Sequence, residues 1–357
     1  MAPQNKAAFY PSDKASSLEV GPSPYPTVGA NELIVKVGTV AINPIDWTIQ
    51  NVGRDVFPFL QYPLAGGLDV SGTVVEVGAG VEGSFKPGDR VIAFSYEFSS
   101  RSGGFQHYVA VPASLTVRIT DSLSFDDAAV LPSGITTAAV ALYQSLGLDL
   151  PATTTTTTTP TRPGDGEKVV LISGGATSVG SNAIQLAVAS GYTVYTTSSP
   201  ANFAHCLSLG ASLVFDYHSA SVAQDLKDAF KGKECVGGLS TTEGSNALVF
   251  DVVGASSSRN EQAKKKVAST LLFNTHSVPG DISAEMVHAY WIKDNAPLLN
   301  AIYGKFLPEA LASGKYQCAP KPVVIGQGLA AIQAALDRGK AGAVSCQKLV
   351  VSLEGEV

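Results

Sequence analysis

One stretch constrains this chain most strongly, a short apolar run followed by a glycine turn and an amphipathic segment. Val169–Ile172 is apolar throughout, which suits a strand buried on both faces. Gly174 and Gly175 open the turn behind it. Helical periodicity then runs to Ala189 and stops at Gly191, the usual C-terminal signal. The stretch therefore predicts a strand, a tight turn and a helix.

This order is typical of a phosphate-binding turn, because glycines let the backbone approach a pyrophosphate and a helix N-terminus attracts its charge. The spacing is Gly174-x-x-Thr177-x-x-Gly180, with threonine where the dinucleotide motif has a middle glycine. An ordinary strand-to-helix connection is therefore the alternative. The residues expected at the phosphates are Gly174, Gly175, Thr177, Ser178, Val179 and Gly180.

Composition excludes several classes of function. The chain has 357 residues, enough for about two domains, and its net charge of −6 disfavours nucleic acid. We expect the one basic run, Lys264–Lys266, to lie on a solvated helix face. No apolar run is long enough to span a membrane, and the first residues lack the apolar core of a secretory signal. The four cysteines form no C-x-x-C pair, so we expect a cytoplasmic protein with reduced thiols.

The first 130 residues predict a β-rich domain of short strands separated by glycine corners. A helical pattern follows from Ser124 to Leu146, and the threonine-rich segment Leu150–Gly166 then predicts an exposed loop. The expected strands are Glu32–Ala41, Asp69–Val77, Arg90–Phe94 and Phe105–Val111.

Residues 167–305 alternate strand and helix, which predicts a parallel sheet covered on both faces. A helix is expected after each of the first four strands. The second of these helices begins at Asn202, the third begins at Ala220, and the fourth ends at Lys266. The expected strands are Val169–Ser173, Thr193–Thr197, Ser212–Asp216, Ala247–Val253 and Ala268–Phe273. A helix over Leu329–Asp337 and a strand over Gln347–Ser352 return to the first domain. The predicted division is 1–163, 164–305 and 306–357.

Several motifs in fixed order resemble the zinc-independent branch of the medium-chain dehydrogenase/reductase superfamily. The chain is most similar to the quinone-oxidoreductase-like enzymes and to the fungal trans-acting enoyl reductases of polyketide pathways. The resemblance implies an α/β fold with a GroES-like β-rich catalytic domain and a Rossmann-type, doubly wound parallel sheet, the active site lying in the cleft between them. Its marks are Asn43–Trp47, Gly66 to Gly78, Pro87–Val91, Ala128–Pro132, the glycine turn, Ser198–Phe203 and Lys348–Val351.

The resemblance also indicates that no metal is bound. Zinc-dependent relatives carry a cysteine at the first motif and a His-Glu pair after the Gly66 position. Here the matching stretches read Ala41-Ile42-Asn43 and Gly66-Gly67-Leu68-Asp69. A single carboxylate does not make a site with three protein ligands.

The predicted cofactor is NADPH. No acidic residue follows the second strand, where one would bind the ribose of NAD and repel a 2′-phosphate. Hydroxyl and amide groups stand there instead, in Ser198, Ser199 and Asn202, and the resemblance places Tyr217 against the same phosphate. Asp216 and the absence of a clear lysine or arginine keep NADH open as the alternative.

Residues matched to the family supply the candidate site. Asn43 is expected to bond the substrate or the ribose, and Thr137 to touch the nicotinamide. Asp46 is expected to hold its loop by bonding backbone. For the proton donor the candidates are Thr48, where fungal relatives often have lysine, Tyr62 and a bound water. The further expected cofactor contacts are Pro44, Asp46, Val253, Gly254, Phe273 and Thr275, the last four at the ends of later strands.

Three hypotheses remain open from the sequence. The first is NADPH-dependent reduction of an activated C=C bond, in an enoyl thioester or an enone, in trans to a polyketide synthase. The second is a quinone or small-enone reductase. The third is a nucleotide-binding scaffold that has lost catalysis. The aromatic residues Trp47, Phe57, Phe59 and Tyr62 with Leu60 suit either a lipophilic substrate or, more commonly, a core.

Overall fold

The computed structural model describes residues 3–152, 167–257, 263–342 and 344–355. It divides into two compact units, one formed by Met1–Ser133 with Leu307–Val357 and the other by Gly134–Phe306. The sequence placed the first division at 163, which lies outside the described residues. The structure divides earlier, because the helical segment after Ser133 packs within the second unit, where the Tyr143 hydroxyl donates to the Leu186 carbonyl (3.1 Å).

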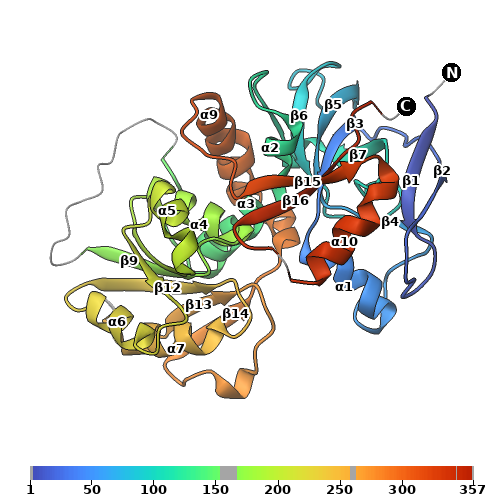
Figure 1. Ribbon diagram of the computed structural model, residues 1–357. Helices are drawn as coiled ribbons and strands as arrows, with labels where there is room; N and C mark the ends of the chain where they lie inside the picture. Colours follow the sequence, from blue (N-terminus) through green and yellow to red (C-terminus); the bar gives the residue numbers. More distant parts are fainter. Residues whose placement is uncertain (1–2, 153–166, 258–262, 343, 356–357) are drawn as a thin grey trace. The chain divides into compact units, whose positions relative to one another are not determined.

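The second unit is built on one parallel sheet of six strands, in the order β11-β10-β9-β12-β13-β14 (Figure 1). Its centre is the apolar run predicted from the sequence, and Val169 to Ile172 are fully buried. The strands are β9 (Lys168–Ser173), β10 (Thr193–Ser198), β11 (Leu213–Asp216), β12 (Glu234–Ser240), β13 (Lys265–Ser269) and β14 (Ile282–Met286).

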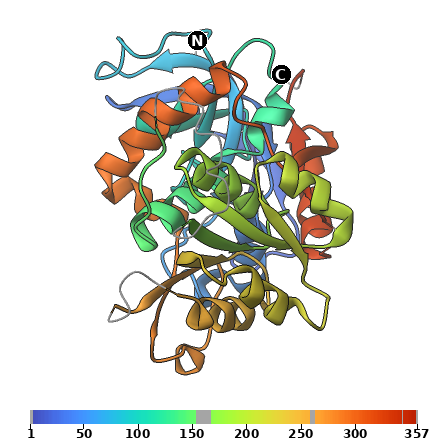
Figure 2. The same ribbon diagram turned by 90° about the vertical axis from the view of Figure 1, so that its left-hand side faces the viewer.

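Helices cover both faces of this sheet, with α4 and α5 on one side and α6 and α7 on the other (Figures 1 and 2). Two further segments, Val140–Ser145 and Asn300–Phe306, are wound as π-helix. The helices are α4 (Ser178–Ala189), α5 (Phe203–Ser208), α6 (Val222–Ala229), α7 (Ser245–Ala255) and the short α8 (Ala296–Leu299).

Three expectations for this unit are wrong. Ala247–Val253 lies within helix α7, and the strand of that position is β12, which the sequence analysis missed. An apolar run buried on most sides gives the same pattern in a strand and in a helix, which explains the error. Lys265 and Lys266 begin β13 and are not on a helix, and the strand expected over Ala268–Phe273 ends at Ser269.

The first unit contains a seven-stranded sheet and a smaller three-stranded sheet. Strands β3, β5, β6 and β16 have the predicted bounds. In the larger sheet the path is β15-β16-β3-β5-β6-β8, with β7 on β3, and in the smaller it is β2-β1-β4. The strands are β1 (Asn5–Tyr10), β2 (Glu19–Ser23), β3 (Glu32–Ala41), β4 (Leu64–Ala65), β5 (Asp69–Val77), β6 (Arg90–Phe94), β7 (Tyr108–Pro112), β8 (Thr116–Arg118), β15 (Lys321–Gln327) and β16 (Gln347–Ser352).

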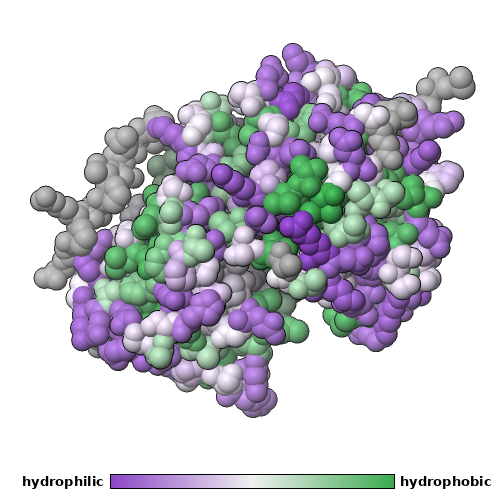
Figure 3. Space-filling view, in the orientation of Figure 1, coloured by the Kyte–Doolittle hydropathy of each residue, from purple (hydrophilic) through white to green (hydrophobic). Residues whose placement is uncertain are grey.

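The helices of this unit are α1 (Pro44–Val52), α2 (Phe125–Ala129), α9 (Leu307–Ala312) and α10 (Ile332–Lys340), and α3 (Pro132–Ala139) begins in it. Helix α1 packs closely on α10, since a Cβ at Gly339 would lie 2.5 Å from the Trp47 ring. On the face shown in Figure 3, apolar side chains gather over β15, whose Val324 is 48% exposed. Within the described residues, no helix is long and apolar enough to cross a membrane.

Candidate active site

The glycine turn of the second unit joins β9 to α4, and Thr177 caps the helix. The Thr177 hydroxyl donates to the Gly174 carbonyl (2.8 Å), and its oxygen accepts from the Gly180 N–H (2.9 Å). A threonine at this position satisfies an otherwise free N–H of the first helical turn. This explains why the motif has threonine where a middle glycine was expected.

Two glycines of the turn are required by space and conformation. Gly174 has φ +88°, a left-handed conformation that favours glycine. A Cβ on Gly180 would lie 2.1 Å from the Gly174 carbonyl oxygen, so the first turn of α4 rests directly on the backbone of the turn. The backbone N–H groups at the helix start are therefore held close to the turn, as a pyrophosphate site requires.

Two buried serine hydroxyls beside this turn have no hydrogen-bond partner in the described part of the chain. They are Ser178 Oγ, in the first turn of α4, and Ser198 Oγ, at the end of β10. Ser198 is only 3% exposed. Buried hydroxyls without partners are uncommon, and each one calls for an explanation. Both stand at the carboxyl edge of a parallel sheet, so a bound dinucleotide would satisfy them, and the residues present fit this cofactor.

The ends of β10 and β11 form the side expected to recognise the ribose. Ser198 pairs in register with Asp216. The Asn202 amide donates to the Ser199 hydroxyl (3.0 Å), which fixes the loop after β10. Hydrogen bonds from the backbone N–H and the ring of His218 hold the pKa of the Asp216 carboxyl below its usual range. The Asp216 carboxylate therefore already accepts hydrogen bonds from His218.

The strand β12 brings residues to the site that the sequence analysis missed. Thr241 follows its last residue, and the Thr241 hydroxyl donates to the Ser173 carbonyl (2.7 Å) and lies 3.0 Å from the Thr177 hydroxyl. Val253 and Gly254 were expected at a strand end, and this placement is wrong because both belong to α7. Val253 is fully buried in the hydrophobic core of the unit. The signal that was overlooked is the short run Glu234–Ser240, interrupted by two glycines.

Phe273 and Thr275 lie in the loop after β13, as expected for residues beyond a strand end. The Phe273 ring packs edge-on against Phe250, with 5.8 Å between ring centroids, and Thr275 is exposed. On α3, Thr137 is half-buried, whereas its neighbour Thr136 is fully buried and shares a 2.7 Å hydroxyl contact with Tyr303. This contact joins α3 to the π-helical segment Asn300–Phe306.

In the first unit, Asn43 belongs to a buried charged network. Its amide nitrogen donates to Asp69 Oδ2 (2.9 Å), and its amide oxygen accepts from the Lys348 ammonium (2.5 Å). Lys348 also pairs with Asp69 (3.1 Å), whose second oxygen accepts from the Ser133 N–H (2.6 Å). Both polar atoms of the Asn43 amide are thus engaged within the unit, and its predicted contact with substrate stays a prediction.

Asp46 bonds backbone, as expected. Its carboxylate accepts from the Asn43 N–H (2.8 Å), and the side chain is 1% exposed. Burial raises the pKa of Asp46 to about 7, and the nearby Asp69 charge acts in the same direction. Bonds from the N–H groups of Asn43 and Gly67, together with the Lys348 charge, oppose the rise.

The two candidate proton donors are also engaged within the first unit. The Thr48 hydroxyl donates to the Pro44 carbonyl (2.8 Å) one helical turn earlier. The Tyr62 hydroxyl lies 3.3 Å from Asp13, and the Arg54 guanidinium lies over its ring. Pro44 itself is exposed at the first position of α1.

The aromatic residues divide between core and surface. Leu60 is buried and Trp47 packs against the core of the unit. Phe57, Phe59 and Phe98 form a cluster with ring centroids 5.9–6.5 Å apart, in which Phe59 is 61% exposed. The core interpretation therefore holds for Trp47 and Leu60 and not for Phe59.

The positions matched to zinc ligands do not fit a metal. The first matched stretch, Ala41–Asn43, contains no cysteine, and Asp69, the lone carboxylate of the second stretch, is paired with Lys348. Within the described ranges, no three His, Cys, Asp or Glu side chains gather so as to hold a metal ion.

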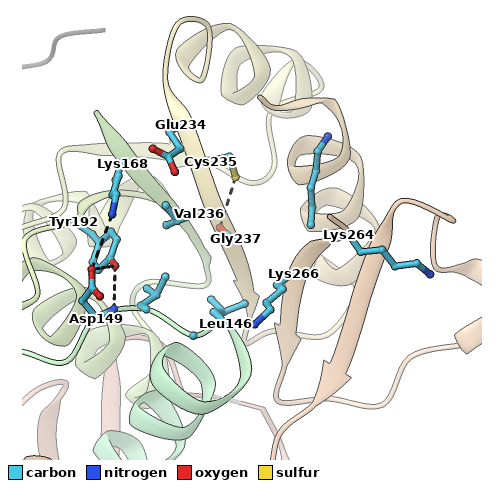
Figure 4. A pocket seen from close by; sticks show the side chains of 13 residues that line it. Leu146, Asp149, Lys168, Tyr192, Glu234, Cys235, Val236, Gly237, Lys264 and Lys266 are labelled. Atoms are coloured by element: carbon cyan, nitrogen blue, oxygen red, sulfur yellow. Dashed lines mark hydrogen bonds and ion pairs between the residues drawn. The ribbon is translucent and has the colours of Figure 1, made fainter. Parts of the chain in front are cut away.

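A hollow of about 320 Å³ lies at the opposite edge of the six-stranded sheet (Figure 4). It is lined by the first residues of β9, β12 and β13, including Lys168, Glu234 and Lys266, and by Asp149, whose carboxylate accepts from the Tyr192 hydroxyl (3.0 Å). Dinucleotides bind at the carboxyl ends of parallel strands. The hollow at the amino ends is therefore separate from the candidate site.

Comparisons with known proteins agree with this architecture. The family model of the alcohol dehydrogenase GroES-like domain matches residues 29–121. Dehydrogenase pigH of Monascus ruber is 42% identical, over 98% of this chain and 100% of its own length. Trans-enoyl reductase himH of Aspergillus japonicus is 37% identical, over 98% and 97%. The crystal structure of CurK enoyl reductase shares the fold, with a TM-score of 0.75 at 21% identity over 98% of this chain and 99% of its own.

Proposed function

The chain belongs to the medium-chain dehydrogenase/reductase superfamily of nicotinamide-dependent oxidoreductases, and on that premise we propose that it reduces an activated C=C bond with NADPH. The observation that carries the proposal is the pair of buried, unpartnered hydroxyls of Ser178 and Ser198 beside the glycine turn. They stand where a dinucleotide would meet the α4 N-terminus and the end of β10.

The preference for NADPH rests on the residues after β10. Ser198, Ser199 and Asn202 offer hydrogen bonds and no negative charge, and Asp216 is held by His218. A carboxylate at the Ser198 position would repel a 2′-phosphate. These residues discriminate against NADH only if the 2′-phosphate gains contacts with them, so the binding of both nucleotides tests the preference.

The proposed reaction follows from the buried polar side chains of the first unit. Asp69 and Asn43 are bonded to Lys348, so we propose that the enzyme needs no zinc to polarise an alcohol or a ketone. An enone or enoyl thioester is already polarised by its own carbonyl. NADPH, when bound, supplies a hydride to the β-carbon. The chain's task is to orient the reactants, exclude water and admit a proton.

The proton source we favour is a bound water. The Thr48 and Tyr62 hydroxyls are both engaged within their own unit, and Asp46 is buried. Thr137 remains the proposed contact to the nicotinamide. Because himH is named a trans-enoyl reductase, we also propose that the lipophilic substrate is presented by a polyketide synthase.

The test is calorimetric titration of the full chain with NADPH and with NADH. The variants are Ser198→Asp and Asn202→Ala, with Ser122→Asp, an exposed serine of the other unit, as the matched control. We expect tight NADPH binding that Ser198→Asp abolishes and that Ser122→Asp leaves unchanged. Oxidation of NADPH at 340 nm with crotonyl-pantetheine and with a simple enone then tests the reaction. Failure of the parent to bind either nucleotide would refute the reductase function.

A further inference from the structure

The part of the chain that surrounds the predicted adenosine side lacks strong cations. No lysine or arginine occurs between Lys168 and Lys227, a stretch that supplies β9, β10 and β11. The basic side chains in it are His205 and His218. A 2′-phosphate is bound most strongly by hydrogen bonds from cationic donors. If NADPH is the cofactor, these two histidines are the side chains of this stretch that can become cationic donors.

His205 bonds to Ser181 of helix α4, and Ser181 bonds to the glycine turn. Its Nε2 lies 2.9 Å from Ser181 Oγ, and that hydroxyl donates to the Gly175 carbonyl (3.1 Å). Since the Ser181 hydrogen is used on Gly175, the serine oxygen accepts from His205 Nε2. His205 thus supports the turn and is not available to a ligand at this nitrogen.

His218 is placed differently. It follows the end of β11, where Asp216 lies in register with Ser198, and its side chain is 61% exposed. Its backbone N–H donates to Asp216 Oδ1 (3.0 Å), and its ring Nδ1 lies 3.0 Å from the same oxygen. The Tyr217 ring is adjacent, with 4.0 Å between centroids. Because the carboxylate accepts, Nδ1 carries hydrogen, and Nε2 is left without a hydrogen-bond partner among the described residues.

The charged groups on the surrounding elements are mostly paired with one another. Asp225 accepts from Ser221, Lys227 pairs with Asp251, and Asp228 pairs with Lys231. The titratable groups on the elements packed against β11 are Tyr195 on β10, His205 and Cys206 on α5, and Asp225, Lys227 and Asp228 on α6. Asp216 is therefore the charge that acts directly on the His218 ring.

We propose that His218 is the specificity-determining residue for the 2′-phosphate of NADPH. Asp216 holds the ring through Nδ1, and Nε2 takes up a proton from solvent when the phosphate binds, so that an N–H donates to a phosphate oxygen. Asp216, which kept NADH open as the alternative in the sequence, thus holds in place the histidine that selects NADPH. This inference rests on the proposed function, since it requires the nicotinamide dinucleotide site.

The experiment is calorimetric titration with NADPH and NADH at pH 6.5 and pH 8.5, in two buffers of different ionisation enthalpy, which reports the protons taken up. The variants are His218→Gln and His218→Lys, and Lys231→Gln is the control that removes an exposed charge from the same unit. We expect His218→Gln to lower the preference for NADPH about tenfold at pH 6.5, since charge-assisted bonds are lost. We expect it also to reduce proton uptake relative to the parent.

His218→Lys should restore NADPH binding at both pH values, because the lysine ammonium carries its charge at pH 6.5 and at pH 8.5. The 2′-phosphate itself titrates in all variants alike, so the comparison isolates residue 218. If the parent prefers NADPH and His218→Gln retains both the preference and the proton uptake, the inference is wrong. If the parent shows no preference for NADPH, the proposed cofactor is wrong instead.

Discussion

Replacing Asp46 with asparagine should change how the stability of the first unit depends on pH. The pKa of Asp46 is raised from its ordinary 3.8 to about 7 by burial. Between these values the folded chain retains a proton that the unfolded chain releases, so the free energy of unfolding falls as pH rises. At 1.36 kcal/mol for each pH unit, the full effect is about 4 kcal/mol above pH 7 and about 3 kcal/mol between pH 5 and pH 8.

Asparagine resembles the neutral carboxyl and keeps an oxygen for the Asn43 N–H, so its contribution does not vary with pH. Any loss from imperfect bonding of the new amide is a constant offset. The free energy of unfolding of Asp46→Asn, minus that of the parent, should therefore rise by about 3 kcal/mol from pH 5 to pH 8.

Urea denaturation can measure this difference through Trp47, which is next to Asp46 on α1. The chain has two tryptophans, so a Trp291→Phe background assigns the fluorescence to the first unit. Asp55→Asn is the matched control, because Asp55 is a surface aspartate paired with Lys14, and its difference from the parent should stay flat. A flat difference for Asp46→Asn as well would refute the argument and indicate that the buried carboxyl stays ionised beside Lys348.

Two further predictions follow from close contacts. Gly180→Ala places a Cβ against the Gly174 carbonyl, so the turn must move. Calorimetry should find the NADPH affinity lowered at least tenfold, and thermal unfolding should show a loss of about 1–3 kcal/mol in stability. Unchanged affinity would contradict this geometry. Lys348→Met leaves the buried Asp69 carboxylate without its ammonium partner and should destabilise the chain by about 3–5 kcal/mol. The double variant with Asp69→Asn should recover part of this loss. Strictly additive losses would show that the two groups are not coupled.

The sequence predicted most of what depends on local pattern. Strands β3, β5, β6 and β16 have the predicted bounds because each is a short run closed by turn residues. The glycine turn between β9 and α4 was predicted for the same reason, whereas the role of Thr177 as the cap of α4 was not. Helix α7 was mistaken for a strand because its residues are apolar on several faces, and with β12 missed, Thr241 could not be found.

The charged network around Asn43 could not be predicted from local sequence patterns, for a different reason. Asp69 and Lys348 are far apart in the sequence and meet because β16 pairs with β3, which pairs with β5. Yet part of the result follows from physics alone. A fully buried carboxylate requires a cation or several donors, since burying an unpaired charge is very costly. Within the part of the chain that the structure describes, no cluster of metal-ligating side chains surrounds Asp69. The chain balances the Asp69 carboxylate with the buried Lys348 ammonium and with two N–H donors, one from the Asn43 amide and one from the Ser133 backbone.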